Sequence, residues 1–132
     1  ISASLVGSEM CIRDSGKTRV LDYKTGRVQL SKLGIIDWEL LSQAPELDQA
    51  RQMLIYAFLW NKNNPDMQAD LVGIIALRQN KKEPLYVGEK STIRGKVNPE
   101  ITPDYMSNIK QILIKIINRL YNLNEPFVEP TV

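Results

Sequence analysis

The clearest pattern of apolar and polar positions lies near the C-terminal end of the chain. Isoleucine and leucine recur there at helical spacing, with basic residues between them. Thr102 can cap the helix, Pro103 suits the first helical position, and Asp104 favours the positive end of the helix dipole. The pattern predicts an amphipathic helix with one face packed on a core.

Two apolar stretches upstream predict a buried helix and a buried strand. Residues 53–60 (MLIYAFLW) are apolar all round, and Pro45 offers a first-turn residue. We therefore expect a helix over 46–62 that is buried on more than one side. Residues 69–79 (ADLVGIIALRQ) form a near-continuous apolar run, typical of a central strand covered on both faces. Residues 85–90 (LYVGEK) predict a further, edge-like strand.

A third strand is predicted over residues 17–24 (KTRVLDYK). It contains β-branched and aromatic residues, and Gly16 and Gly26 flank it. The connection over 27–45 leaves room for a short helix near IIDWELLSQ.

Composition indicates a soluble globular domain and narrows its chemistry. The 132 residues suit one domain, of which 43% are hydrophobic and 24% charged. A net charge of +2 does not by itself indicate a nucleic-acid partner. The chain lacks histidine, and its lone Cys11 excludes an intramolecular disulfide or a multi-cysteine metal site. Catalysis would rest on carboxylates, lysine, tyrosine or a bound ion, and no apolar run is long enough to span a bilayer.

Residues 1–15 (ISASLVGSEMCIRDS) fit poorly with the rest of the chain. They show no sustained period, and SLVGSEMCIRD resembles a linker-derived run seen at the ends of translated environmental sequence reads. We therefore expect residues 1–15 to be non-native or disordered and to join no central strand. Residues 16–132 would then form the domain.

Asp22 and Lys24 are the first candidates for chemistry. Residues i and i+2 of a strand point to the same face, so the two side chains converge. The carboxylate can hold Mg²⁺ through oxygen, and the ammonium can orient a water or stabilise negative charge developing on a phosphate. These groups suffice for metal-assisted phosphodiester hydrolysis without histidine. The alternative is a surface salt bridge on an edge strand.

Gln52 and Tyr56 are the second pair of candidates. They stand four residues apart, so they share one face of the predicted helix and interrupt its apolar run. A buried tyrosine hydroxyl and glutamine amide need polar partners. We expect this face to lie on the Asp22 side of the sheet, with Leu54 and Phe58 turned into the core. The alternative is an ordinary core tyrosine beside a boundary glutamine.

Together these motifs resemble the RecB/AddB-type branch of the PD-(D/E)XK nuclease superfamily. VLDYKTG lies on a strand, and a helix bearing Q-x-x-x-Y and a further strand follow, as in that family. The resemblance covers roughly residues 17–78. It implies an α/β fold: a partial restriction-endonuclease-like core with a central mixed sheet flanked by helices. Residues 16–132 would be the C-terminal part of the nuclease domain.

The resemblance also implies roles for individual residues. Asp22 would be a metal-ligating acid, Tyr23 would lend its backbone carbonyl to the metal, and Lys24 would be the catalytic lysine. Gln52 and Tyr56 would contact the DNA backbone or support the site. The implied cofactor is Mg²⁺ or Mn²⁺, and the implied partners are DNA and a helicase subunit or domain, with no membrane.

The implied function is Mg²⁺-dependent DNA cleavage, exonucleolytic, in cytoplasmic double-strand-break repair and recombination alongside a helicase. The alternative is a catalytically dead RecB-like module that binds nucleic acid or acts as a scaffold.

The chain departs from the family pattern in two places. The family supplies a second metal-binding acid on the preceding strand, in a G-x-x-D setting, and that position falls within residues 1–15. Glu9 and Asp14 are both candidates, and the sequence does not decide between them. Many relatives carry cysteines beyond the last helix that ligate an iron–sulfur cluster, and no cysteine follows the helix here. We therefore expect no such cluster.

Overall fold

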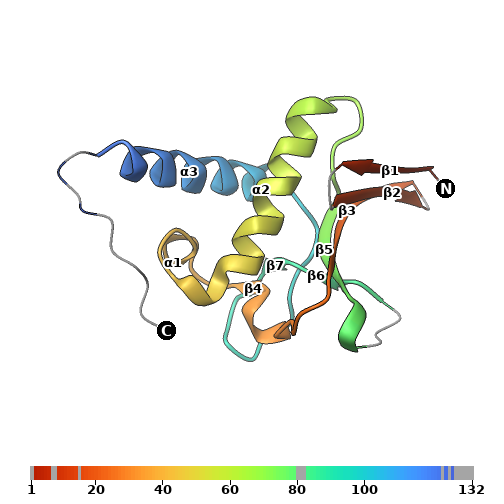
Figure 1. Cartoon of the computed structure of the whole chain (residues 1–132), viewed down its shortest axis with the longest axis horizontal. Helices are drawn as coiled ribbons and strands as arrows, with labels where there is room; N and C mark the ends of the chain where they lie inside the picture. The colour runs from red at the N-terminus through yellow and green to blue at the C-terminus, as the bar shows by residue number, and fades with distance from the viewer. Residues whose placement is uncertain are drawn as a thin grey trace.

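A computed structural model describes the backbone of residues 2–6 and 9–14, and residues 16–79, 83–122, 124 and 126 in full (Figure 1). The described strands are β1 (Ser2–Val6), β2 (Glu9–Asp14), β3 (Lys17–Lys24), β4 (Gly34–Ile35), β5 (Leu71–Ala76), β6 (Leu85–Tyr86) and β7 (Gly88–Glu89). The helices are α1 (Trp38–Leu41), α2 (Asp48–Asn63) and α3 (Pro103–Leu120), with 3₁₀ turns at Leu30–Lys32, Pro45–Leu47 and Leu77–Gln79.

The main sheet is mixed, as the sequence predicts. Its strand order is β1-β2-β3-β5-β6, with β3 parallel to β5 and the other neighbours antiparallel. The short strands β4 and β7 form a separate parallel pair. Figure 1 shows α1, α2 and α3 on the same side of the main sheet. The fold is therefore a mixed α/β arrangement in which the described helices cover one face of the sheet.

The N-terminal strands correct one expectation. Residues 2–6 and 9–14 have extended backbones, and β2 lies between β1 and β3. The expectation that residues 1–15 join no central strand is thus wrong for the second of these segments, since β2 lies inside the sheet. That the stretch is non-native or disordered stays a prediction.

The parallel pair of strands forms the centre of the domain. The predicted strand over 17–24 matches β3, and β5 occupies the middle of the predicted run over 69–79. Val20, Val72 and Ile74 are buried on the face that α2 covers. The other face of β5 carries Leu71 and Ile75, which are only half-buried. The prediction that this strand is covered on both faces is therefore wrong, because no helix in the described part of the chain lies over the second face.

The helices largely follow the sequence pattern. Pro45 opens a 3₁₀ turn, and α2 then runs from Asp48 to Asn63, close to the predicted 46–62. Leu59 is 45% exposed, so α2 is less enclosed than its all-round apolar sequence predicts. The Thr102 hydroxyl accepts a hydrogen bond from the backbone N–H of Tyr105 at 3.1 Å, which confirms the predicted cap of α3. The predicted strand over 85–90 divides into β6 and β7.

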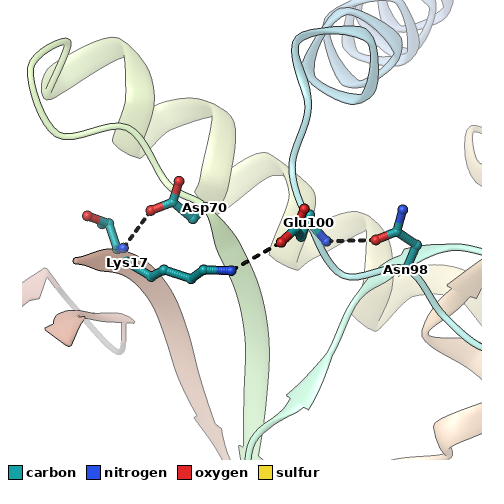
Figure 2. A network of polar contacts seen from close by, with 5 residues as sticks. Lys17, Asp70, Asn98 and Glu100 are labelled. Carbon is teal, nitrogen blue, oxygen red and sulfur yellow. Dashed lines mark hydrogen bonds and ion pairs between the residues drawn. The ribbon is translucent and has the colours of Figure 1, made fainter. Parts of the chain in front are cut away.

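A polar network fastens the start of β3 to β5 and to the segment before α3 (Figure 2). The Asp70 carboxylate accepts from the backbone N–H of Thr18 at 2.8 Å, and the backbone N–H of Asp70 donates to the Thr18 carbonyl at 2.8 Å. Lys17 Nζ donates to Glu100 Oε1 at 3.1 Å, and Asn98 Oδ1 accepts from the Glu100 N–H at 3.3 Å. This network lies at the opposite end of β3 from Asp22 and Lys24.

We predict that Asp70→Ala lowers the free energy of unfolding by about 1.5 kcal/mol, because a charge-assisted hydrogen bond to a buried N–H is lost. Urea denaturation measures the change. Lys17→Ala is the matched control, since it removes an ion pair whose side chains are 52% and 64% exposed. Such pairs contribute about 0–1 kcal/mol. Equal losses in the two variants would contradict the prediction.

Tyr105 anchors α3 in the core. It is 2% exposed, its ring meets that of Trp38 edge to face with centroids 5.1 Å apart, and its hydroxyl donates to the Val87 carbonyl at 3.4 Å. Glu89 accepts a hydrogen bond from the Trp38 ring N–H at 3.1 Å. Burial raises the pKa of Tyr105, and the negative charge of Glu89 raises it further.

This shift predicts a loss of stability at alkaline pH. A raised pKa in the folded state gives a contribution that is complete below the unfolded pKa of about 10 and is lost above it, because only the unfolded chain then ionises readily. The free energy of unfolding should fall above about pH 10, and Tyr105→Phe should reduce this fall. Denaturation at pH 8 and pH 11 measures the difference. The same fall in both proteins would show that lysines, not Tyr105, set the alkaline limit.

Candidate functional site

Asp22 and Lys24 meet at the carboxyl end of β3. Lys24 Nζ lies 2.9 Å from Asp22 Oδ2, as expected for residues that share a strand face. The Asp22 side chain is 1% exposed and the Lys24 side chain 23% exposed. Because β3 lies between β2 and β5, the alternative of a surface salt bridge on an edge strand is wrong.

The Asp22 carboxylate is short of partners. Neither of its oxygens accepts a hydrogen bond within the part of the chain that the structure describes, although Oδ2 is at ion-pair distance from Lys24. A buried carboxylate is costly unless hydrogen bonds or a cation compensate for its lost water. Carboxylate oxygens are the ligands that Mg²⁺ prefers. Because Oδ2 already lies beside the Lys24 ammonium, Oδ1 is the oxygen that remains for a divalent cation.

Gln52 links the strand to α2. Its Oε1 accepts a hydrogen bond from Lys24 Nζ at 2.5 Å, so the ammonium is held between a carboxylate from β3 and an amide from α2. This contact confirms that Gln52 faces the Asp22 side of the sheet. An ammonium has three N–H donors. Gln52 accepts one of these hydrogen bonds, and the Asp22 contact is an ion pair without a hydrogen bond, so Lys24 keeps N–H groups for a water or a phosphate oxygen.

Tyr56 lies one helical turn beyond Gln52. It is half-buried, and both residues line a shallow hollow of about 380 Å³ on the surface of α2. Leu54 is buried in the core and Phe58 packs against it, as expected, but Tyr56 packs against the core as well. That Tyr56 faces Asp22 stays a prediction. No polar contact within the described residues joins Tyr56 to Asp22 or Lys24.

Tyr23 points the other way. Its place between Asp22 and Lys24 directs its side chain to the opposite face of the sheet, where it is 40% exposed. The role that the resemblance implies for Tyr23 uses the backbone carbonyl alone. That role is compatible with this orientation.

The strand register separates the two candidates for a second acid. Glu9 of β2 is the register partner of Asp22, whereas Asp14 pairs with Lys17. Five residues of strand separate Lys17 from Asp22, about 16 Å along β3. Asp14 is therefore too far from the site, and the backbone of Glu9 is adjacent to it. Among the side chains that the structure describes, no group of three or more histidine, cysteine or acidic residues could hold a metal ion.

The sequence also contains a basic segment that was not among the predicted site residues. Lys90, Arg94 and Lys96 fall within seven residues that contain no acid. This local charge cluster was visible in the sequence, although the net charge of +2 conceals it.

Comparisons of the chain with protein-family models, curated protein sequences and solved structures gave no match. None of the helices in the described residues has the length and apolar character needed to cross a membrane.

The buried Asp22 carboxylate predicts that this residue lowers the stability of the metal-free protein and allows it to bind Mg²⁺. Asp22→Asn removes a buried carboxylate whose oxygens accept no hydrogen bond within the described residues, and the Lys24 ammonium that loses its counter-charge is partly exposed and keeps Gln52. We therefore expect the melting temperature without metal to rise by a few degrees, equivalent to about 1 kcal/mol. Millimolar Mg²⁺ should raise the melting temperature of the wild type, because it binds the folded state, and should leave Asp22→Asn unchanged.

Thermal denaturation with EDTA and with Mg²⁺ measures both effects. Asp66→Asn is the control, since it removes an exposed carboxylate between α2 and β5. An Mg²⁺ response that survives in Asp22→Asn would show that the ion binds elsewhere.

Proposed function

We propose that this domain is a Mg²⁺-dependent deoxyribonuclease of the RecB/AddB type, with a partial restriction-endonuclease-like core. The observation that carries the proposal is the buried Asp22 carboxylate, which lacks hydrogen bonds and lies beside an ammonium that Gln52 holds in place. A structural ion pair would gain most from full hydrogen bonding. A site prepared for a cation and a phosphate leaves these oxygens open.

Each group has a distinct task in this proposal. Asp22 and the backbone carbonyl of Tyr23 would hold Mg²⁺, which when bound lowers the pKa of a water ligand and polarises a phosphate oxygen. Lys24 directs an N–H group to the attacking water or to the negative charge that grows on the phosphate. Gln52 is a positioning residue that fixes the Lys24 ammonium, and Tyr56 supports the DNA backbone one turn along α2.

The wider role rests on the resemblance of the D-Y-K-T and Q-x-x-x-Y motifs. It supports exonucleolytic digestion of DNA during double-strand-break repair and recombination, in the cytoplasm and alongside a helicase subunit or domain. Asp22, Lys24 and Gln52 of this chain are arranged in a way that agrees with these motifs.

One observation favours a second candidate, a RecB-like module that binds DNA without cutting it. Among the described side chains no group of three or more histidine, cysteine or acidic residues could hold a metal ion, so Asp22 is not part of a complete ligand set there. Glu9, which is adjacent through its backbone, is the remaining position. Cleavage by the wild-type protein separates the two candidates.

The decisive experiment is a nuclease assay on linear DNA with Mg²⁺, using the polypeptide that carries this domain. Lys24→Ala should reduce cleavage about a hundred- to thousand-fold, because one contact to developing charge is lost, and should leave Mg²⁺ and DNA binding intact. Asp22→Ala should also lose Mg²⁺ binding, measured by calorimetric titration. Lys24→Arg should not restore cleavage, because the guanidinium is wider and differently hydrated.

Lys115→Ala is the matched control. Because Lys115 pairs with Glu39 on the surface, this variant should cleave DNA as the wild type does. Full cleavage by Lys24→Ala would contradict the assigned role. DNA binding without any cleavage by the wild type would favour the second candidate.

A further inference from the structure

The segment after β7 forms an ordered loop that carries concentrated positive charge. We refer to residues 90–96 (KSTIRGK) as the basic loop. Lys90 Nζ donates to the Ile93 carbonyl at 3.1 Å, and the Gly95 N–H donates to the Thr92 carbonyl at 3.0 Å, so the loop is closed by its own hydrogen bonds. Ile93 at its tip is 82% exposed.

The cations of this loop are available to a ligand. Arg94 and Lys96 are exposed, and neither side chain makes a hydrogen bond or ion pair with another residue in the described ranges. Two acids flank the loop in the sequence: Glu89 accepts a hydrogen bond from Trp38, and Glu100 pairs with Lys17. Neither forms an ion pair with Arg94 or Lys96, so the loop presents positive charge that is unpaired within the described residues.

An apolar hollow of about 560 Å³ lies beside the loop, and we call it the loop hollow. Its lining includes Leu30, Leu85, Tyr86 and Val97, together with Lys90 and Lys96. Tyr86 supplies an aromatic ring, and its hydroxyl accepts a hydrogen bond from Arg19 at 3.0 Å. An aromatic ring among apolar side chains, with ammonium groups beside it, is the combination that binds a base and its phosphate.

A single 3₁₀ turn separates the loop hollow from a second hollow that leads toward Gln52. The 3₁₀ turn Leu30–Lys32 contributes Leu30 to the loop hollow and Lys32 to a second, smaller hollow. Gln49 lines that smaller hollow and also the hollow that contains Gln52, the partner of Lys24. In Figure 1 the start of α2 and the segments after β3 and β7 gather at the same end of the molecule.

We propose that the basic loop and the loop hollow form a second nucleic-acid-binding site, which seats one unpaired nucleotide of a single strand. The base enters the hollow against Tyr86, and the flanking phosphates contact Arg94 and Lys96. The choice of nucleic acid as the ligand rests on the proposed function, and the charge and aromatic lining support it independently. A strand held here and at Lys24 would give single-stranded DNA a longer path over the domain than the cleavage site alone.

The test is fluorescence anisotropy with a labelled 20-nucleotide oligothymidine in EDTA, so that binding is measured without cleavage. Lys96→Glu should weaken binding about tenfold or more, because an attraction to phosphate becomes a repulsion. Lys96→Ala should reduce the slope of log Kd against log salt by about 0.7, the value for one phosphate contact on a single strand. Lys110→Glu makes the same charge change at an exposed position of α3 and should weaken binding much less.

The base contact is tested with an abasic oligonucleotide of the same length. The wild type should bind it about tenfold more weakly than oligothymidine, since base–aromatic stacking is lost. Tyr86→Leu should no longer distinguish the two oligonucleotides. Tyr86→Phe keeps the ring while losing the hydroxyl that contacts Arg19, so it should still distinguish them.

Several results would overturn the proposal. Equal affinities of Lys96→Glu and Lys110→Glu for oligothymidine would show that Lys96 contacts no phosphate. Equal affinities of the wild type for thymine-bearing and abasic strands would show that no base binds in the loop hollow. Equally good competition by polyglutamate would show a general anion surface. If Tyr86→Leu does not fold, Lys96→Glu and Tyr86→Phe still decide the outcome. Because no cleavage is measured, binding that depends on Lys96 in a protein that never cuts DNA would support this site and reject the nuclease.

Discussion

The parallel pairing of β3 with β5 beneath α2 is the arrangement on which the rest of the structure depends. It places β3 inside the sheet, so that Asp22 is withdrawn from water, and it brings the carboxyl end of β3 against the first turns of α2. Without that helix the Lys24 ammonium would have Asp22 as its one polar partner among the described residues. With it, the ammonium is held from two elements, and its position depends on how firmly helix and sheet are packed.

The two ends of β3 differ in how fully their polar groups are hydrogen-bonded. At the start of the strand Asp70 satisfies the backbone of Thr18 twice, and the Lys17–Glu100 pair adds an exposed contact. At the other end a carboxylate is buried with its oxygens unfilled. The polar groups of Thr18 and Asp70 are satisfied by the chain itself, whereas the Asp22 oxygens accept no hydrogen bond within the described residues. This contrast is the physical basis for proposing a scaffold at one end and a site at the other.

Much of the fold was predictable because local signals agreed with the final packing. Helix α3 followed its cap and its period, and β3 followed from β-branched residues between glycines. The half-open face of β5 was not predictable, because an apolar run indicates burial without identifying what covers each side. For the site, spacing alone placed Asp22 beside Lys24. The 2.5 Å contact with Gln52 agrees with the helix face that the motif implied, but it needed the tertiary packing of α2 on β3. The loop hollow was not predictable at all, since its lining comes from segments that are far apart in the sequence.

The Lys24–Gln52 contact spans 28 positions of sequence, and it is fixed by a strand and a helix rather than by the segment that joins them. That segment contains exposed positions such as Gly26, where an added Cβ would meet no atom within 4 Å, so an insertion there begins outside the core. Doubling the length of a flexible connection costs only about 0.6 kcal/mol of closure entropy. Evolution could therefore lengthen this connection at such a position while the amide stays within reach of the ammonium, whereas shortening it would remove core residues such as Leu33, Ile35 and Leu41. For proteins built on this plan, the gap between the D-Y-K and Q-x-x-x-Y motifs would be a poor measure of kinship, and the geometry of the two side chains a better one.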